Sequence, residues 1–200
     1  MIEKKGYFFI AVVIATMIVI FSIRISISME PLELLMRLCG LYGYFGMSVS
    51  TMMTPYLKGL RQAFGKNFVE VHHVTAVIGF GCITVHPIIY LIQTMDATIF
   101  LPRLDSWIAF WTMAGAPALI LLYIALVAAF LRTRFTRYWR YLHALMYLVL
   151  TFGIIHADLI QADFAQSPVL LALYNIIFGI VVFTFVIKRR ARYLQKKAKK

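Results

Sequence analysis

Residues 72–86 read HHVTAVIGFGCITVH, an apolar stretch with a histidine at each end. A second stretch, residues 139–156, reads WRYLHALMYLVLTFGIIH and places His143 and His156 thirteen residues apart. Both stretches belong to apolar segments of the ~20 residues that a helix needs to cross a bilayer. An ionisable side chain in lipid is costly, so these intramembrane histidines indicate a functional site.

The composition of the chain restricts it to the membrane class. Hydrophobic residues make up 62% of the 200 residues and the mean hydropathy is +0.84, values that soluble domains of this size do not reach. Lysine and arginine outnumber aspartate and glutamate by 20 to 8. These cations lie in short loops and in the C-terminal tail, so membrane topology explains them and no nucleic-acid partner is expected.

The apolar segments predict an all-α bundle of six transmembrane helices. Long unbroken runs exclude the alternating strands of a membrane barrel. The first run follows Lys4 and Lys5 and lacks a convincing signal-peptide cleavage site, so we interpret it as an uncleaved transmembrane helix. The whole chain, residues 1–200, is then one transmembrane domain. The expected spans are 7–24, 34–57, 70–94, 107–131, 139–158 and 168–187.

Loop charges predict the orientation of this bundle. One side carries only Arg24, Arg37 and Arg103, and the positive-inside rule makes it the outer side, with both termini in the cytoplasm. We therefore expect a multi-pass protein of the cell inner (plasma) membrane. Residues 188–200 form a basic cytoplasmic tail, either a lipid-headgroup anchor or a docking patch for an acidic electron donor. The seventeen cations of the inner side are Lys4, Lys5, Lys58, Arg61, Lys66, Arg132, Arg134, Arg137, Arg140, Lys188, Arg189, Arg190, Arg192, Lys196, Lys197, Lys199 and Lys200.

The spacing of the third-segment histidines places two of them on one helix face. Fourteen residues rise about 21 Å and turn about 1400°, which is about 40° short of four turns, so His72 and His86 share a face. Gly79 lies midway on that face and leaves room for a flat macrocycle or for a closely packed helix. His73 points about 100° away, which favours His72 as the ligand.

The fifth-segment histidines are less regular. Thirteen residues turn about 1300°, so His143 and His156 diverge by about 140° on an ideal helix. A helix distortion, for which Gly153 is a candidate, would bring both onto the same partner. The predicted orientation places His72 and His143 at one depth, near the cytoplasm, and His86 and His156 at the other, near the outer face.

Two histidine pairs at two depths predict two haem b groups, each held by one histidine from each helix. Arg103 lies at a depth where its guanidinium could bind a haem propionate, as do several inner cations; headgroup anchoring is the alternative reading of each. The competing hypotheses are hydrogen-bonded histidines without a ligand, a proton relay, metal binding without haem, and a haem-free transporter or binding protein with histidines along a polar path. The inner cations are Lys58, Arg61, Lys66, Arg132 and Arg140.

The quoted stretches resemble the ferric-reductase-like transmembrane domain, a superfamily that includes the NADPH oxidases, the ferric reductases and MsrQ, the membrane subunit of a bacterial methionine sulfoxide reductase system. A third stretch, GLYGYFGMSVSTMMTPYLKGLRQAFG at residues 40–65, supports the same resemblance. The chain length and the fifth segment are most similar to MsrQ, and the histidine spacings to the NADPH oxidases. The inner histidine of the third segment, which MsrQ-type proteins can lack, is present here and favours two haems.

The resemblance implies a membrane cytochrome b that is an electron-transfer subunit of an oxidoreductase system. Family members with their own flavin and nicotinamide domains carry them after the membrane domain, whereas this sequence shows no glycine-rich nucleotide motif. Electrons are therefore expected to enter from a separate cytoplasmic flavoprotein, from FMN or FAD at a separate or loosely bound site, or from a quinol. They would leave to an external redox partner, ferric iron or oxygen.

Overall fold

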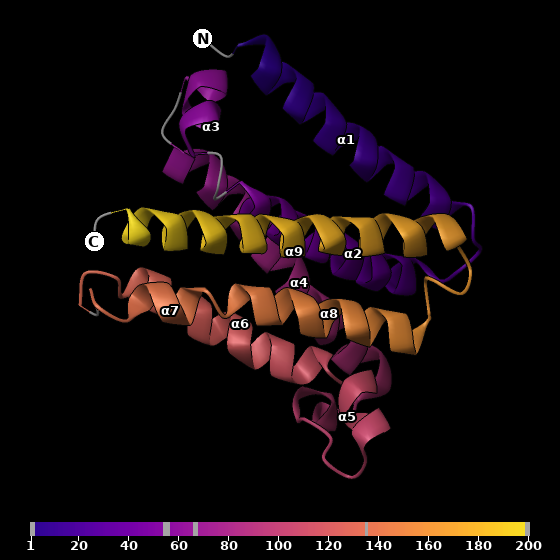
Figure 1. Ribbon diagram of the computed structural model, residues 1–200. Helices are drawn as coiled ribbons and strands as arrows, with labels where there is room; N and C mark the ends of the chain where they lie inside the picture. Colours follow the sequence, from indigo (N-terminus) through magenta and orange to yellow (C-terminus); the bar gives the residue numbers. More distant parts are fainter. Residues whose placement is uncertain (1–2, 54–56, 66–67, 135, 199–200) are drawn as a thin grey trace.

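The computed structural model describes residues 3–53, 57–65, 68–134 and 136–198. In this part of the chain the regular elements are all helical, which confirms the predicted all-α class. In Figure 1 the long helices α8 and α9 run across the view, and the short helix α5 lies at the bottom. They are α1 (Lys4–Ile25), α2 (Pro31–Met52), α3 (Leu57–Phe64), α4 (Phe68–Thr94), the 3-10 helix η2 (Ala97–Phe100), α5 (Trp107–Thr112), α6 (Gly115–Phe130), α7 (Trp139–His143), α8 (Met146–Ile160) and α9 (Pro168–Lys197).

Four described segments are long and apolar enough to cross a membrane: Lys4–Ile25, Glu70–Thr94, Trp139–Ile160 and Pro168–Gln195. They correspond to the first, third, fifth and sixth expected spans. The second corresponds to α2, which has the same length as α1 but is less apolar. The fourth is divided between Thr112 and Gly115 into α5 and α6. Six spans therefore stay a prediction, and residues 54–56 of the second span lie outside the described residues.

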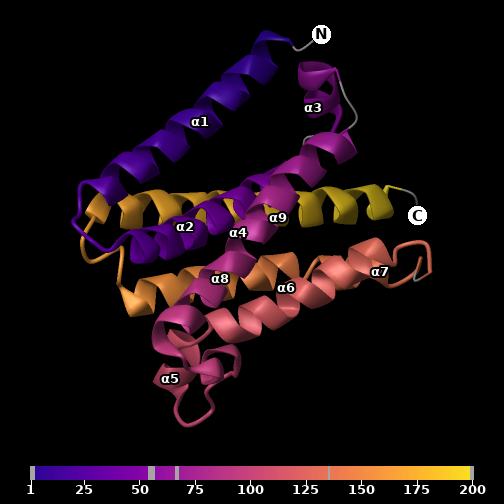
Figure 2. The same ribbon diagram turned by 180° about the vertical axis from the view of Figure 1, so that it is seen from behind.

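The two ends of the bundle differ in the elements they carry. The start of α1, α3, α7 and the end of α9 lie toward one end, at the left in Figure 1 and at the right in the reverse view of Figure 2. The α1–α2 and α8–α9 turns lie toward the opposite end. We call these the inner and outer ends, after the predicted orientation. Of the inner cations, Lys66, Lys199 and Lys200 lie outside the described residues.

Helix α2 is the centre of the core. It contacts α1, α4, α8 and α9, and its contact with α4 is the most extensive between any two described helices. Glycines make that contact close: a Cβ on Gly79 would lie 2.8 Å from the backbone nitrogen of Met47, and one on Gly43 would lie 2.8 Å from that of Ile83. Because α2 is enclosed by protein, it can bury polar side chains such as Ser48 and Ser50.

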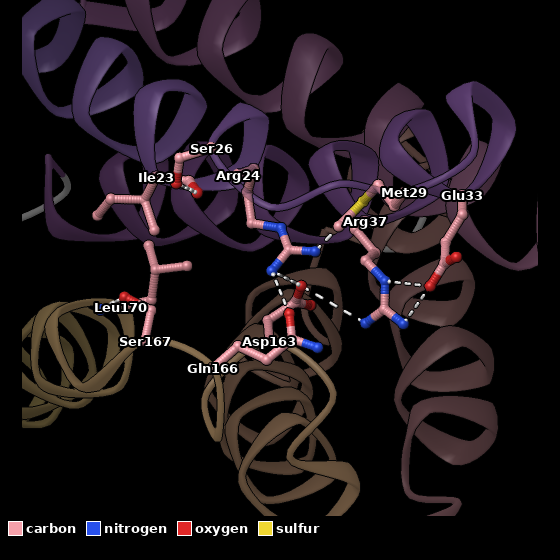
Figure 3. Close-up of polar contacts among 10 residues, drawn as sticks. All are labelled: Ile23, Arg24, Ser26, Met29, Glu33, Arg37, Asp163, Gln166, Ser167 and Leu170. Atoms are coloured by element: carbon pink, nitrogen blue, oxygen red, sulfur yellow. Dashed lines mark hydrogen bonds and ion pairs between the residues drawn. The ribbon is translucent and has the colours of Figure 1, made fainter.

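A buried ion network joins three segments at the outer end (Figure 3). Arg24, at the end of α1, has no exposed surface, and its Nη1 lies 3.0 Å from Oδ1 of Asp163 in the α8–α9 turn. Nη1 of Arg37 on α2 lies 3.5 Å from the same carboxylate oxygen. The other Nη of Arg37 binds Glu33 at 2.6 Å, and Arg24 donates to Gln166 at 3.4 Å. One carboxylate thus fixes the outer ends of α1 and α2 to the start of α9.

We expect Asp163→Asn to destabilise the protein by about 3–5 kcal/mol, since the amide keeps the shape of the side chain but leaves the buried Arg24 charge without its counter-ion. Thermal unfolding in detergent, followed by circular dichroism, measures the loss. Asp105→Asn is the matched control, because Asp105 pairs with Arg103 at 3.0 Å on an exposed loop and such pairs contribute about 0–1 kcal/mol. Equal losses in the two variants would contradict a structural role for the buried network.

Candidate metal centre: two histidine pairs

The inner pair consists of His72 and His143. His72 lies in the second turn of α4, and His143 is the last residue of α7. Their ring centroids are 6.3 Å apart and the rings are nearly perpendicular, at 79°. His73 lies beside His72, with 6.0 Å between ring centroids. Of the two neighbours, His72 both contacts His143 and hydrogen-bonds to α2 through Ser50; which of the two is a ligand stays a prediction.

The outer pair consists of His86 and His156. His86 lies on α4, fourteen residues and about 21 Å of helix beyond His72, because α4 is continuous over this range. His156 lies on α8, thirteen residues beyond His143. The structure therefore brings His72 and His143 into contact and places His86 and His156 on the outer parts of α4 and α8. Their role as metal ligands stays a prediction.

All four histidines are held through the same ring nitrogen. Each Nδ1 lies within hydrogen-bond distance of a backbone carbonyl oxygen on a neighbouring helix. A carbonyl can only accept, so Nδ1 of His86, His143 and His156 carries the hydrogen and Nε2 keeps its lone pair for a metal ion. Nδ1 of His72 also lies 2.8 Å from the hydroxyl of Ser50, which is closer than the Ser50 carbonyl and can donate or accept. The two histidines of α4 are held by α2, and the other two by the α5–α6 segment. The bonds are His72 to Ser50 at 3.2 Å, His86 to Met36 at 2.8 Å, His143 to Ala125 at 3.3 Å and His156 to Thr112 at 2.6 Å.

The break between α5 and α6 supplies one of these carbonyls. In a continuous helix, the amide of Ala116 would bond to Thr112, but here it donates to Met113 at 3.1 Å. The next residue, Pro117, has no amide hydrogen and sits in the first turn of α6, where none is needed. The Thr112 carbonyl can therefore accept the short hydrogen bond from His156. Pro117 therefore lies directly after the break and does not kink the middle of a helix.

A second break, between α7 and α8, changes the angle between His143 and His156 around the helix axis. Between α7 and α8 the backbone makes bonds over three residues, from Leu145 to Leu142 at 3.0 Å and from Tyr147 to Ala144 at 3.2 Å. A residue in such a 3-10 turn advances about 120°, against about 100° in an α-helix. The extra rotation reduces the predicted 140° divergence. The distortion thus lies directly after His143.

Gly153, the expected site of that distortion, lies inside the continuous helix α8. A Cβ on Gly153 would lie 3.2 Å from the ring of Tyr44, so the glycine allows α8 to approach α2. Two other glycines face the outer pair directly. A Cβ on Gly40 would lie 3.0 Å from Nδ1 of His86, and one on Gly115 would lie 3.0 Å from Nε2 of His156. Sequence reasoning connected neither glycine with a histidine, because each meets its histidine only across a helix contact.

Gly79 and Arg103 were predicted to contact the cofactor. Gly79 lies in the α2–α4 contact, which matches the helix-packing alternative for this residue. Arg103 lies on the loop before α5, with 57% of its side chain exposed, and forms two hydrogen bonds of 3.0 Å with Asp105. These hydrogen bonds lower the pKa of the Asp105 carboxyl. A cation that sequence reasoning did not single out, Lys188 on α9, is half-buried, whereas its neighbours Arg189 and Arg190 are exposed.

A family model described as ferric reductase like transmembrane component matches residues 39–154, more than half of the chain. The chain belongs to this family. The match runs from α2 into α8 and includes His72, His86 and His143, while His156 lies two residues beyond it. No match was found among curated proteins or among solved structures. The predicted resemblance is confirmed, and with it the placement of the protein in a membrane.

Gly40→Ala and Gly115→Ala should each displace one ring of the outer pair, since the added methyl group would lie 3.0 Å from an imidazole nitrogen. We expect each variant to lose most of its outer-level haem and keep the inner one, as measured by the haem-to-protein ratio after purification. Gly179→Ala on α9 is the control, because nothing lies within 4 Å of its Cβ position. Full haem content in both variants would show that the outer rings tolerate a shift.

Proposed function

We propose that this protein is a membrane cytochrome b, an electron-transfer subunit with six transmembrane helices and both termini in the cytoplasm. Two haem b groups, one at each histidine pair, would carry single electrons across the membrane from a cytoplasmic donor to an acceptor on the outer side. The observation that carries the proposal is the shared hydrogen-bond pattern, in which all four histidines use Nδ1 for the protein and keep Nε2 for a metal.

The residues at each level fit a haem. Two imidazoles on facing helices would hold the iron of a haem between them. An imidazole whose other nitrogen donates to a carbonyl is fixed in its tautomer and orientation and is a more basic ligand. The bound group supplies reversible one-electron chemistry of iron at a potential that ligands, burial and nearby charge set. His72 and His143 would hold the inner haem, and His86 and His156 the outer one.

The protein itself would insulate the path of the electrons between the two levels. The two levels lie about 21 Å apart along α4, within the ~30 Å of hydrocarbon that a transmembrane helix crosses. Apolar residues separate them, such as Val77 and Ile78, which are 67% and 57% exposed on the outside of α4. Large exposed apolar side chains on a helix that is hydrophobic all round are expected where lipid covers it. Water and ions would thus be kept from the path.

We propose the electron donor and the electron acceptor as chemical classes. On the inner side, the electrons would come from a separate cytoplasmic flavoprotein, from bound FMN or FAD, or from a quinol. Exposed cations at that end, among them Arg61 on α3 and Arg189 on α9, suit an acidic protein donor as well as lipid headgroups. Stopped-flow reduction with each donor class separates the three. On the outer side, the acceptor would be a redox partner, ferric iron or oxygen.

The ligand assignment is tested by alanine variants at five positions. His72→Ala and His143→Ala should each remove the inner haem and keep the outer, whereas His86→Ala and His156→Ala should do the reverse. His73→Ala is the matched control and should keep both haems. The measurements are haem content and the reduced-minus-oxidised spectrum. Loss of a haem in His73→Ala with full retention in His72→Ala would show that the neighbouring histidine is the ligand.

The order of the two sites gives a second readout from the same variants. In His86→Ala, a cytoplasmic donor should still reduce the inner haem, while reduction of an external acceptor stops.

The competing function, a haem-free transporter with histidines along a polar path, predicts no iron and no porphyrin in the purified wild-type protein. Iron and porphyrin analysis therefore decides between the two classes before any variant is made.

A further inference from the structure

Cys39 lies on the face of α2 that contacts α4. One helix turn before it, the carbonyl oxygen of Met36 lies 2.8 Å from Nδ1 of His86 on α4. One turn after it, a Cβ on Gly43 would lie 3.2 Å from the carbonyl oxygen of Gly79 on α4. Residues three or four apart share a face of an α-helix, so Cys39 belongs to the same contact face as the residues on either side of it.

Cys82 lies on the facing side of α4, at the same level. It stands three residues after Gly79 and four before His86, the two α4 residues of those contacts. Because α2 and α4 are antiparallel, the position between the two contact points on α2 faces the position between the two contact points on α4. The thiol groups of Cys39 and Cys82 interact with each other accordingly.

The two helices approach closely enough here for a covalent bond. A Cβ on Gly79 would lie 2.8 Å from the backbone nitrogen of Met47, and one on Gly43 would lie 2.8 Å from that of Ile83. A disulfide joins Cα atoms about 4.4–6.8 Å apart, whereas the axes of packed helices are usually about 8–10 Å apart. A glycine contact therefore brings facing residues into disulfide range. Both cysteines are free and half-buried, so part of each side chain faces the surroundings of the bundle.

We propose that Cys39 and Cys82 form a reversible disulfide bond between α2 and α4, a thiol–disulfide site that is separate from the histidine pairs and needs no haem. The oxidant is a small disulfide that dissolves in lipid. One cysteine thiolate attacks a sulfur of the oxidant, forms a mixed disulfide and releases one thiol. The second cysteine attacks the mixed disulfide, forms the protein bond and releases a second thiol. The protein loses two electrons and two protons, which reduce the oxidant to two thiols.

The bond would brace the contact through which α2 holds His86. It would lie one helix turn from the Met36 carbonyl that accepts the hydrogen bond of this histidine. In the thiol form, packing and hydrogen bonds alone hold the two helices together at this level. The alternative role of the two cysteines is that of small apolar side chains in a helix contact, which predicts no bond between them.

The experiment treats the purified full chain in detergent with dithiodipyridine, a neutral disulfide that enters lipid, and records the intact mass. The wild-type protein should lose two hydrogens, carry no probe group and remain a monomer on a non-reducing gel. Dithiothreitol should restore the original mass. Two probe groups that stay on each chain, a disulfide-linked dimer, or an unchanged mass would each overturn the proposal.

Cys82→Ala combined with Gly81→Cys is the matched control, because it keeps two cysteines and turns one of them by about 100° around α4. Nothing lies within 4 Å of the Cβ position of Gly81, so the new side chain has room. This variant should retain two probe groups and form no bond, and Cys39→Ser should retain one probe group. A bond that forms in the control as fast as in the wild type would contradict the facing geometry.

Thermal unfolding tests whether the bond braces the helices. The oxidised wild-type protein should unfold at a higher temperature than the reduced one, since the bond restricts the unfolded chain. Treatment with the oxidant should leave the unfolding temperature of Cys39→Ala unchanged. Equal unfolding temperatures of the oxidised and reduced wild-type forms would overturn the bracing role.

Discussion

The hydrogen bond from each histidine Nδ1 to a backbone carbonyl is the constraint that organises this molecule. It fixes the ring tautomer, leaves Nε2 for a ligand and requires a helix at hydrogen-bond distance from every histidine. Helix α2 meets this requirement for His72 and His86, which explains why it lies at the centre of the core although it is less apolar than α1, α4 and α8. The α5–α6 segment meets it for His143 and His156, and the break before Gly115 releases the Thr112 carbonyl for the purpose.

Close approach of helices follows from the same constraint. An imidazole can reach a carbonyl on the next helix only where the intervening position has little or no side chain, and Gly40 provides such a position. Gly43, Gly46 and Gly79 bring α2 and α4 together between the two levels, so both histidines of α4 meet α2 along one continuous contact. At the outer end, the Arg24–Asp163 ion pair holds α1 and the α8–α9 turn in place.

Much of this arrangement could be predicted from the sequence because it depends on period and composition. The helical class and the placement of the histidines at two levels along their helices follow from 3.6-residue geometry applied to long apolar runs. The breaks could not be predicted, because they depend on which backbone carbonyl a distant histidine takes. Gly153 was the wrong site for the distortion in the fifth segment for this reason. Helix α3 was missed because its eight residues lie in a stretch that was read as a basic loop.

The partners of individual side chains could not be predicted from the sequence either. Gly115 looked like an ordinary residue of an apolar run, but its Cβ position lies 3.0 Å from Nε2 of His156 on another helix. Arg103 was selected by its depth, and the structure pairs it with Asp105 in the same exposed loop. A linear pattern gives the depth of a side chain along the membrane normal, whereas its partner depends on how the loop or the neighbouring helix is placed.

The central claim is that both histidine pairs bind iron through Nε2 from two sides. Electron paramagnetic resonance of the oxidised, purified protein tests it most directly, because the spin state of ferric haem reports its axial ligands. We expect two low-spin ferric species per chain, each with two imidazole ligands. A high-spin ferric signal at either level, or a preparation without haem iron, would contradict it.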